Sequence, residues 1–492
     1  MGWRMDKLGP YELNSIVTGD CLKVMRKIPD ESATAVLCDP PYGLAFMGKG
    51  WDKFMDNAAY QAWVTTWAAE LLRACKPGAV GLFFGGTRTF HRLACGLEDA
   101  GWELYDTLMW MYGSGFPKSM SISKAIDKAA GAEREVVGVN PNYCENRVDS
   151  IGTATGIYGG AGPDKGKHIT APATDLAQTW DGYGTALKPS YEPVLLCRKP
   201  RGKTYAKCAV EGGAGALNID ECRVGYQSDL DKASATPQGQ CTSKEISAIG
   251  AEPDAGRDLE RVAFNRPQQK GRWPANLILD EGAAAMLDEM SGDCSSARAN
   301  GNPNNPVHQQ LPDQLMSWGG VRETHDYRDR GGASRFFYTA KASRREREAG
   351  LENLPVVGRK NPMRSANGTG EKNFEGGFQD DKKARNPHPT VKPIALTEYL
   401  ARLIRPPEEY LDDAVILIPF AGVGSEIIGA IKAGWRNWLG IEISEEYAEI
   451  ANARIAYWQA QPPRLGLPSY RPTGFTGYQV AFAISQTQAT PG

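Results

Sequence analysis

The stretch Asp39-Pro40-Pro41-Tyr42-Gly43 is the starting point, because it directly follows the short apolar run 34–38. An apolar, β-branched run of this length, ended by two prolines, predicts a buried strand with an acid at its tip. The prolines fix φ at about −65° and lack N–H donors, so the backbone joins neither a helix nor a sheet. We call residues 39–42 the ledge. It presents a carboxylate, the carbonyl oxygens of Asp39 and Pro40 and the Tyr42 ring, which suits a planar ring with an exocyclic amine. The alternative is a proline-rich turn without a chemical role.

The composition is that of an ordinary globular protein, with 41% hydrophobic and 23% charged residues, and 492 residues predict two or three domains. No run of about 18 apolar residues and no signal peptide is evident, so we expect a cytoplasmic location. The ten cysteines form no C-x-x-C pair, which predicts reduced thiols and no metal site. A net charge of −2 means that any nucleic-acid partner needs a local basic groove.

Strands and helices alternate along the N-terminal part of the chain. A strand over 15–18 ends at Gly19-Asp20, and the ledge follows a second strand. Periodicity further predicts a helical turn over 22–28, helices over 60–75 and 90–97, and strands over 79–84 and 104–110. This alternation predicts a parallel sheet with helices on both faces, and acids at two strand tips mark the edge at which such sheets bind ligands.

The middle of the chain is less regular. Loops are expected over 113–187, and a strand over 192–197 precedes a basic group. From about 202 to 335 no long periodic segment is evident beyond a short one at 276–279 and a helix near 282–290, which indicates an irregular domain or insertion. A strand over 336–339 precedes a second basic group. The two groups are candidate phosphate contacts or simply solvated surface: Arg198, Lys199, Arg201 and Lys203, and Lys341, Arg344, Arg345 and Arg347.

The C-terminal part reads as helix, strand, glycine turn, helix, strand, acid and helix. A helix over 394–404 precedes a strand over 414–420, which leads into the glycine turn Ala421-Gly422-Val423-Gly424. A helix over 427–431, a strand over 438–441 that ends at Glu442, and a helix over 447–458 follow. Glycines admit a ligand close to the backbone, and an acid about 20 residues later is placed to bind ribose hydroxyls.

Two features of this unit disfavour a dinucleotide. The third glycine of the dinucleotide pattern is absent, and Glu426 in the first helical turn would repel a pyrophosphate. A nucleoside cofactor without phosphates fits better, and S-adenosylmethionine is one. A purely structural turn is the alternative.

With these motifs in this order, the chain resembles the amino-group DNA methyltransferases of the permuted β class, including bacterial and phage members. Residues 39–42 are similar to the catalytic motif, which in that class precedes the target-recognition region. Residues 420–424 are similar to the cofactor motif, which comes last, and residues 388–393 to the motif just upstream of it. Residues 187–193 also resemble a segment of these proteins. The resemblance implies an α/β, Rossmann-like, S-adenosylmethionine-dependent methyltransferase fold with circularly permuted motif order and an inserted irregular target-recognition region.

The resemblance also implies domains and site residues. The methyltransferase domain would comprise residues 11–205, with the catalytic motif, and 334–460, with the cofactor motif. Residues 206–333 would recognise the target, and 461–492 would form a flexible tail. The implied catalytic residues are Asp39, Pro40, Pro41 and Tyr42. The implied cofactor-binding residues are Asp20 at the adenine, Glu442 at the ribose, and Thr390, Lys392, Phe420, Gly422 and Gly424.

One position departs from the family pattern. The family usually has Asp-Pro-Phe where this chain has Ile418-Pro419-Phe420, and that carboxylate would normally help to hold the methionine amino group. Glu426 or Asp39 is a candidate substitute. If neither acts, Ile418→Asp should tighten cofactor binding.

Methyl transfer to an exocyclic amine needs no covalent enzyme intermediate. Hydrogen bonds from the amine to the Asp39 carboxylate and the Pro40 carbonyl would localise its lone pair on nitrogen, and the base must leave the duplex to reach them, with Tyr42 stacking on it. Cytosine C5 chemistry needs a Pro-Cys nucleophile, which the sequence lacks, and Cys38 is expected to be a packed thiol. Asp at the first ledge position favours adenine N6, with cytosine N4 as the alternative.

The sequence leaves three competing functions open. A DNA-binding protein that has lost catalysis would fit Ile418, whereas the intact ledge argues against it. Methylation of RNA or of protein glutamine is disfavoured by the motif order, and an NAD site by the missing glycine. The expected partner is double-stranded DNA. A restriction endonuclease encoded elsewhere, as in restriction-modification, and a second copy in a homodimer are open alternatives.

Overall fold

The computed structural model divides into two compact units. The larger comprises Met1–Cys222, Ala275–Leu287 and Ala340–Gln461, and the smaller comprises Arg223–Pro274, Asp288–Thr339 and Pro462–Gly492. The assignment of residues 206–333 to target recognition stays a prediction. The structure describes residues 6–44, 52–113, 119–139, 168–202, 204–235, 239–242, 261–264, 270–292, 294–295, 330–340, 344–358, 383–388 and 390–461.

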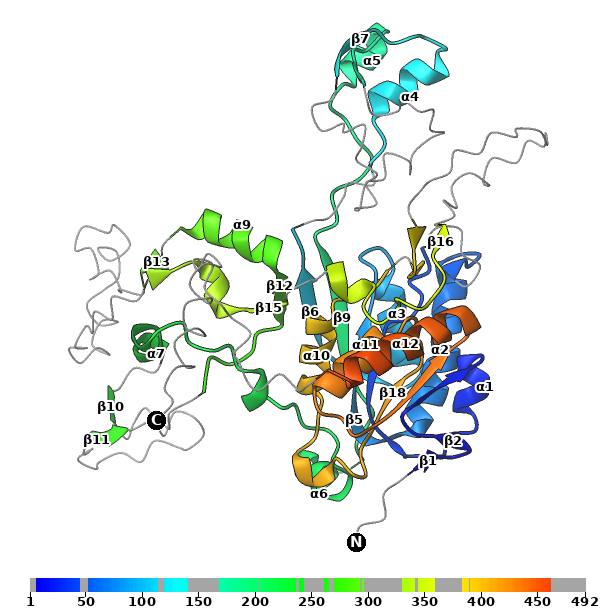
Figure 1. Ribbon diagram of the computed structural model, residues 1–492. Coiled ribbons are helices and arrows are strands. Elements are labelled where there is room, and N and C mark those ends of the chain that lie inside the picture. The colour runs from blue at the N-terminus through cyan, green and yellow to red at the C-terminus, as the bar shows by residue number, and fades with distance from the viewer. Residues whose placement is uncertain are drawn as a thin grey trace, which may run out of the picture. The chain divides into compact units, whose positions relative to one another are not determined.

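A nine-stranded sheet has the order β15-β12-β6-β9-β5-β4-β18-β19-β3, and its strands other than β15 form the centre of the larger unit (Figure 1). In chain order the strands are β3 (Ser15–Thr18), β4 (Ala33–Cys38), β5 (Cys75–Phe84), β6 (Glu103–Met111), β9 (Tyr191–Arg198), β12 (Leu277–Asp280), β15 (Tyr338–Ala340), β18 (Val415–Ile418) and β19 (Asn437–Glu442). The strands predicted from the sequence in this unit are therefore confirmed within a few residues.

The expectation of a purely parallel sheet is wrong at one strand. Neighbours from β3 through β19, β18 and β4 to β5 are parallel, but β9 runs antiparallel to both β5 and β6. Tyr191 at the start of β9 pairs with Met111 at the end of β6, so the chain between them begins and ends at the same end of the two strands. No crossover is then needed. The apolar run 192–197 carries no signal for strand direction.

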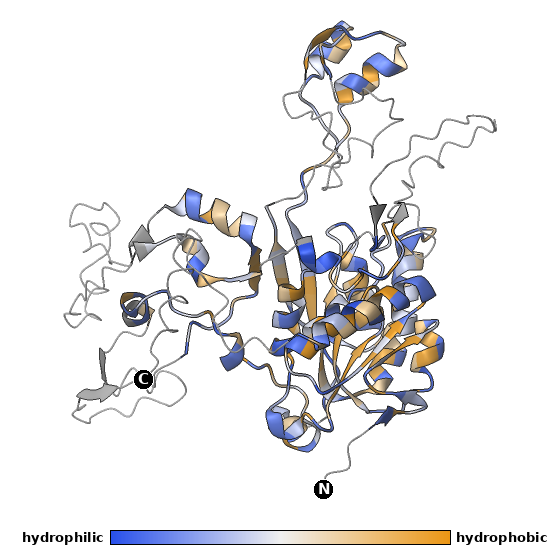
Figure 2. Cartoon of the chain, viewed as in Figure 1, coloured by the Kyte–Doolittle hydropathy of each residue, from blue (hydrophilic) through white to orange (hydrophobic). Residues whose placement is uncertain are grey.

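Helices cover both faces of this sheet. On one face, α1 (Cys21–Met25), α2 (Asn57–Ala74) and α3 (Phe90–Asp99) pack on β4 and β5. Figure 1 shows α10 (Ile394–Leu403), α11 (Ser425–Lys432) and α12 (Glu445–Gln459) together over the other face. The strands between them are mostly apolar (Figure 2), as expected of a sheet buried on both sides. No helix in the described ranges is long and apolar enough to cross a membrane.

Helix α2 shows how local sequence sets an element. Asp56 caps its start, with Oδ1 accepting the Ala59 N–H at 2.7 Å, and Trp67 and Leu71 are fully buried. The spacing predicted a helix up to Cys75, and it ends at Ala74. The chain turns extended two residues before Pro77, because proline disfavours helical backbone at the residue that precedes it.

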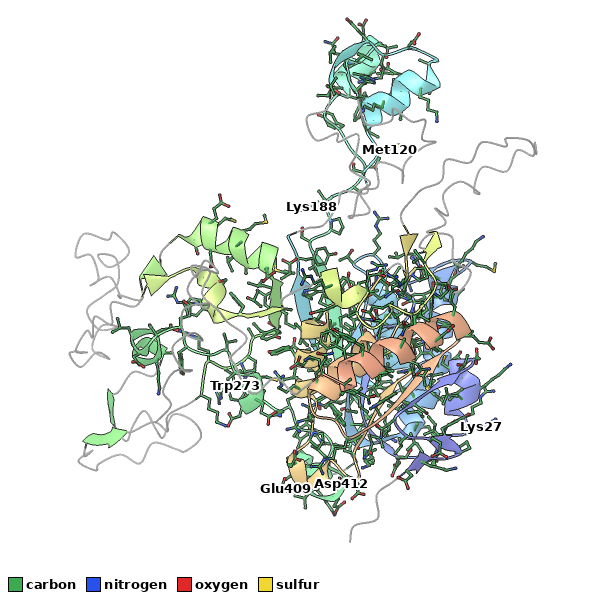
Figure 3. All side chains as sticks on the ribbon, in the orientation of Figure 1. Lys27, Met120, Lys188, Trp273, Glu409 and Asp412 are labelled. Carbon is green, nitrogen blue, oxygen red and sulfur yellow. The ribbon has the colours of Figure 1, made fainter. Side chains whose placement is uncertain are left out.

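The expectation that loops dominate 113–187 is partly wrong. Between Met120 and Lys188, labelled in Figure 3, lie α4 (Ile122–Ala129), β7 (Val136–Val139), β8 (His168–Thr170) and α5 (Asp175–Thr179). Polar contacts hold this segment together. Arg134 donates to the buried Asp127 at 2.5 Å, and the Asp127 carboxylate also accepts the N–H groups of Ala173 and Thr174. Such a core leaves little apolar periodicity in the sequence.

The smaller unit is also organised around acids. The buried Asp231 of α7 (Asp229–Ala235) pairs with Arg272 and lies 3.7 Å from Arg335. Asp288 accepts the Ser334 N–H at 2.8 Å, which fixes a short 3-10 helix over Ala333–Phe336. The strand expected over 336–339 therefore begins only at Tyr338, since this acid stabilises a turn where the side chains favour a strand.

The remaining elements are short. They are β1 (Lys7–Leu8), β2 (Tyr11–Glu12), α6 (Tyr205–Gly212), η3 (Asp220–Cys222), β10 (Gly239–Thr242), β11 (Arg261–Phe264), α9 (Glu281–Ser291), β13 (Cys294–Ser295), β14 (Arg330–Gly331), η6 (Arg344–Arg347), β16 (Val357–Gly358), β17 (Lys383–Ala384) and η8 (Glu408–Tyr410). Helix α9 confirms the helix predicted near 282–290, and the short periodic segment at 276–279 corresponds to strand β12.

Candidate active site

The site lies at the carboxyl ends of four adjacent parallel strands, β3, β19, β18 and β4. A cavity of about 440 Å³ opens there. Ten of the eleven residues predicted for the site line it: Asp20, Asp39, Pro40, Pro41, Tyr42, Thr390, Lys392, Phe420, Gly422 and Glu442. The eleventh, Gly424, shapes the backbone behind it. The sequence therefore predicted which segments, from distant parts of the chain, come together.

Hydrogen bonds to buried side chains hold the backbone of the ledge and of the residues after it. The hydroxyl of Tyr60 on α2 donates to the Pro41 carbonyl at 2.9 Å. The carboxylate of Asp52, 1% exposed, accepts the N–H groups of Gly43 and Leu44 at 2.7 and 3.2 Å. A buried acid that binds successive backbone donors holds the turn in one conformation. Asp52 was not predicted from the sequence, because it lies in a glycine-bearing loop without a recognisable pattern.

The ledge keeps one acceptor open. The Thr89 hydroxyl donates to the Tyr42 carbonyl at 2.6 Å, and the Tyr60 hydroxyl donates to the Pro41 carbonyl. Both carbonyls that follow Pro40 therefore already accept a hydrogen bond. Among the described residues, nothing donates a hydrogen bond to the carbonyl of Pro40. That oxygen and the Asp39 carboxylate lie on adjacent residues of the cavity wall, as the two prolines predicted.

A charged network surrounds the Asp39 carboxylate. The ammonium of Lys392 donates to Oδ2 of Asp39 at 2.7 Å and to the Tyr42 hydroxyl at 3.0 Å. The Tyr42 hydroxyl lies 3.0 Å from Oδ1 of Asp39 and 3.1 Å from Oε2 of Glu192, and it can donate its one proton to either. Lys392 also lies 3.5 Å from Glu192. The structure thus places Lys392, which the family resemblance associates with the cofactor, on the carboxylate of the ledge.

The protonation states of this network follow from its charges. Burial alone would lower the pKa of Lys392. The negative charges of Asp39 and Glu192 raise it by more than burial lowers it, so the pKa is higher than usual and the ammonium stays charged. Burial, together with the same two carboxylates, raises the pKa of Tyr42, so its hydroxyl stays neutral. One cation is therefore shared by two acids that converge on one tyrosine.

The glycine turn after β18 is tied to the tip of β19. Gly422 and Gly424 have φ of +49° and +81°, which glycine adopts most easily. The Gly422 N–H donates to Oε2 of Glu442 at 2.8 Å, and the Ser444 N–H to Oε1 at 2.9 Å. Burial raises the pKa of Glu442, while these N–H donors oppose the shift. The predicted order of strand, glycine turn, helix, strand and acid is confirmed.

The other predicted cofactor residues differ in their surroundings. Asp20 caps α1 and accepts the Lys23 N–H at 3.1 Å, and Thr390 is exposed at the rim. Phe420 packs against Trp63 and Trp67, with ring centroids 5.8 and 5.3 Å away. Trp63 also lines the cavity, although sequence reasoning assigned it no role beyond its place in the helix predicted over 60–75.

Glu192 is a site residue that sequence reasoning did not single out. It lies in the segment 187–193, whose resemblance to family members gives no role for the acid. Cys38 behaves as predicted. It is fully buried at the end of β4, and burial, aided by Asp39, raises the pKa of its thiol well above the usual value, which leaves it unreactive.

The first basic group lies away from the cavity. Because β9 runs opposite to β5, its last residue, Arg198, pairs with Val80 in the middle of β5, away from the carboxyl end of β5 at Phe84. The Arg198 guanidinium lies over the rings of Tyr105 and Tyr205, and Lys199 pairs with Glu31 at 3.7 Å. A phosphate role beside the active site is thus unsupported for this group. Lys203 and Lys341 lie outside the described residues.

These features define an α/β protein with a nucleoside-cofactor site at the carboxyl edge of its sheet and an acidic, proline-fixed ledge that can hold an amine. A family model described as DNA methylase, of the N6/N4 methyltransferases, matches residues 33–453, and the chain belongs to this family. The family depends on S-adenosylmethionine.

Individual relatives are more distant. The type II methyltransferase M.HinfI of Haemophilus influenzae is 26% identical over 112 residues, which are 20% of this chain and 31% of that protein. Among solved structures, the DNA modification methylase TTHA0409 of Thermus thermophilus gives a TM-score of 0.33 at 14% identity over 90% of this chain and 94% of that one. The cytosine-N4-specific PvuII DNA methyltransferase gives 0.36 at 12% identity over 92% and 88%. Structural likenesses this low carry no argument about function.

Proposed function

We propose that this chain is a DNA methyltransferase that uses S-adenosylmethionine to methylate the exocyclic N6 amine of adenine in a base flipped out of the duplex. One observation carries the proposal. The Asp39 carboxylate and the open Pro40 carbonyl line the same cavity as the glycine turn and Glu442. The acceptors for an amine and the site for a nucleoside cofactor therefore adjoin.

The residues of the cavity fit the cofactor. Six acids and one lysine line it in the described part of the chain: Asp20, Asp39, Asp52, Glu192, Glu426, Glu442 and Lys392. This wall suits a cationic ligand and would repel a pyrophosphate. When bound, S-adenosylmethionine supplies an electrophilic methyl group on its sulfonium. Asp20, Glu442 and the backbone at Gly422 are the candidate contacts for its nucleoside part.

The ledge, together with Lys392, would act on the target base in four ways. Asp39 and the Pro40 carbonyl accept hydrogen bonds from the two N–H groups, which localises the lone pair on nitrogen. Lys392 and Tyr42 hold the Asp39 carboxylate in one orientation before the base arrives, so little reorganisation is needed. After methylation Asp39 is placed to take the proton that the nitrogen loses. The Tyr42 ring supplies the stacking surface for the base.

The choice of base rests on the sequence. Asp at the first ledge position favours adenine N6, and methylation of cytosine N4 by the same mechanism is the second candidate. The DNA-binding alternative without catalysis is disfavoured by the fully assembled network of Asp39, Tyr42, Glu192 and Lys392.

Double-stranded DNA is the proposed partner. The target-recognition role of residues 206–333, the restriction endonuclease partner, the homodimer and the cytoplasmic location stay predictions.

The test is direct identification of the product. The protein is incubated with unmethylated plasmid and isotope-labelled S-adenosylmethionine, and the DNA is digested to nucleosides for mass spectrometry, with Asp39→Ala as the inactive control. We expect labelled N6-methyladenine. Labelled N4-methylcytosine would move the activity to cytosine, and label on added RNA or protein but never on DNA would overturn the proposal.

A further inference from the structure

Glu426 is a buried carboxylate in the cavity wall to which the mechanism assigns no role. It lies in the first turn of α11, is 4% exposed, and lines the cavity. Among the described residues no side chain donates a hydrogen bond to it, and no cation lies within ion-pair distance. A buried acid without a partner is costly, so such an acid is expected to be neutral or to await a ligand.

The other five acids of the cavity wall already have partners. Asp39 and Glu192 share Lys392 and the Tyr42 hydroxyl. The remaining three accept backbone N–H groups: Asp20 from Lys23, Asp52 from Gly43 and Leu44, and Glu442 from Gly422 and Ser444. In this described set, Glu426 alone has no donor other than its own backbone N–H.

The nearby cations are committed elsewhere. The ammonium of Lys392 is bonded to Asp39. The fully buried guanidinium of Arg454 donates to the Val423 carbonyl and, at 3.3 Å, to Oγ of Ser425. Both cations influence Glu426 electrostatically without forming an ion pair with it. A cation that can also donate hydrogen bonds to Glu426 must therefore come from a ligand.

We infer that Glu426 binds the α-ammonium of the methionine part of S-adenosylmethionine, an inference that rests on the proposed cofactor. The cofactor carries two cations, the sulfonium and this ammonium. Only the ammonium has N–H donors, and a desolvated carboxylate needs donors as well as charge. Asp39, the other candidate from the sequence, already binds Lys392, which leaves Glu426.

Strand β18 explains why an acid is needed at position 426. Ile418 ends β18, is fully buried, and does not line the cavity. The carboxylate that the family usually carries at this position is thus replaced by an apolar side chain that packs in the interior. Glu426, eight positions later in the chain, supplies an acid on the other side of the same glycine turn.

The test compares two ligands that differ only in the amino group. S-adenosylhomocysteine keeps the ammonium and lacks the sulfonium, and its deamino analogue lacks both. Calorimetry on the full-length wild-type protein should show about 10- to 100-fold tighter binding of S-adenosylhomocysteine, since a charge-assisted bond contributes about 1.5–3 kcal/mol. In Glu426→Gln the preference should fall to about threefold or less, with binding of the deamino analogue unchanged within about twofold.

Glu446→Gln is the matched control, because Glu446 is exposed on α12. It should keep the wild-type preference. Equal binding of the two ligands by wild-type protein, or a full preference in Glu426→Gln, would overturn the assignment. Failure of wild-type protein to bind either ligand would instead contradict the proposed cofactor. A circular dichroism melt of Glu426→Gln, which is nearly isosteric, separates lost binding from lost folding.

Discussion

The ledge after β4 and the glycine turn after β18 face one cavity but treat their carboxylates in opposite ways. Asp39 on the ledge is held by Lys392 at 2.7 Å and by Tyr42 at 3.0 Å before any ligand arrives. Glu426 beyond the turn is more deeply buried, 4% exposed against 16% for the Asp39 side chain, but has no such partner in the described chain. Asp39, which positions the substrate, is held in place before the substrate binds, whereas Glu426, which binds a cationic ligand, has no cation paired with it in advance.

The largest effect should follow from removing the fixed carboxylate. Asp39→Ala removes the main acceptor for the amine, so kcat should fall at least about 10³-fold. Binding of S-adenosylhomocysteine should change by less than about fivefold, because the cofactor contacts lie beyond the ledge. Single-turnover methylation and calorimetry measure the two quantities. Equal losses of catalysis and of cofactor binding would break the distinction between the two regions.

A smaller loss is expected when the internal cation is removed. Lys392→Met leaves Asp39 and Glu192 facing each other without a counter-charge, which should cost about 3 kcal/mol of unfolding free energy and about 10²-fold in kcat. Lys23→Met, an exposed lysine of α1, is the control. Denaturant unfolding and single-turnover rates test this. Unchanged values would mean that Lys392 does not hold the ledge.

The sign of the pH dependence for Lys392 is fixed by its raised pKa. Its contribution to stability is fully present below about pH 10.5, the ordinary lysine value, and is lost only as the pH rises through the higher value of the folded protein. The difference between wild type and Lys392→Met should therefore be constant from about pH 6 to 9.

The same contrast shows how much the sequence could predict. Strand tips, prolines and glycines are local signals, and they located both halves of the site and most strands. The Asp39–Lys392 pair joins residues 353 positions apart, so no local pattern could reveal it. The direction of β9 and the polar core around Asp127 were missed for a related reason: apolar periodicity reports burial and carries no information on strand direction or polar contacts.

Ile418 illustrates a choice that the sequence left open. The departure from the family pattern was visible, with Asp39 and Glu426 as candidate substitutes. The decision between them needed the contacts of Asp39. Because Ile418 is fully buried and outside the cavity wall, an acid there would be charged in the interior, so Ile418→Asp is not expected simply to restore a missing contact.

A third prediction concerns the carboxylate without a partner. Burial and the Asp39 charge raise the pKa of Glu426 to about 7, although the positive charge of Lys392 acts in the opposite direction. Cys38 and Arg454 are the other titratable groups whose charges act on it. Between pH 6 and 7.5 its ionised fraction rises about eightfold, so S-adenosylhomocysteine should bind about eightfold tighter at pH 7.5.

The free protein should show the reverse trend. A carboxyl whose folded pKa is raised binds more protons when folded, so stability falls as the pH rises from about 4.5 to 7. The thermal shift given by S-adenosylhomocysteine should grow over the same range and stay flat in Glu426→Gln. A pH-dependent shift that persists in this variant would assign the titration to another group.

The smallest effect is expected for Glu192→Gln. Glu192 touches the Tyr42 hydroxyl at 3.1 Å and Lys392 at 3.5 Å, both of which have closer or equal contacts with Asp39. Loss of its charge should lower kcat by about fivefold through a less firmly held ledge, with KM for the cofactor and the melting temperature unchanged. Glu103→Gln, an exposed acid at the far end of β6, should leave all three values unaltered. If Glu192→Gln were as damaging as Asp39→Ala, the acceptor for the amine would be the pair of acids, and the fixed group would extend from the ledge to β9.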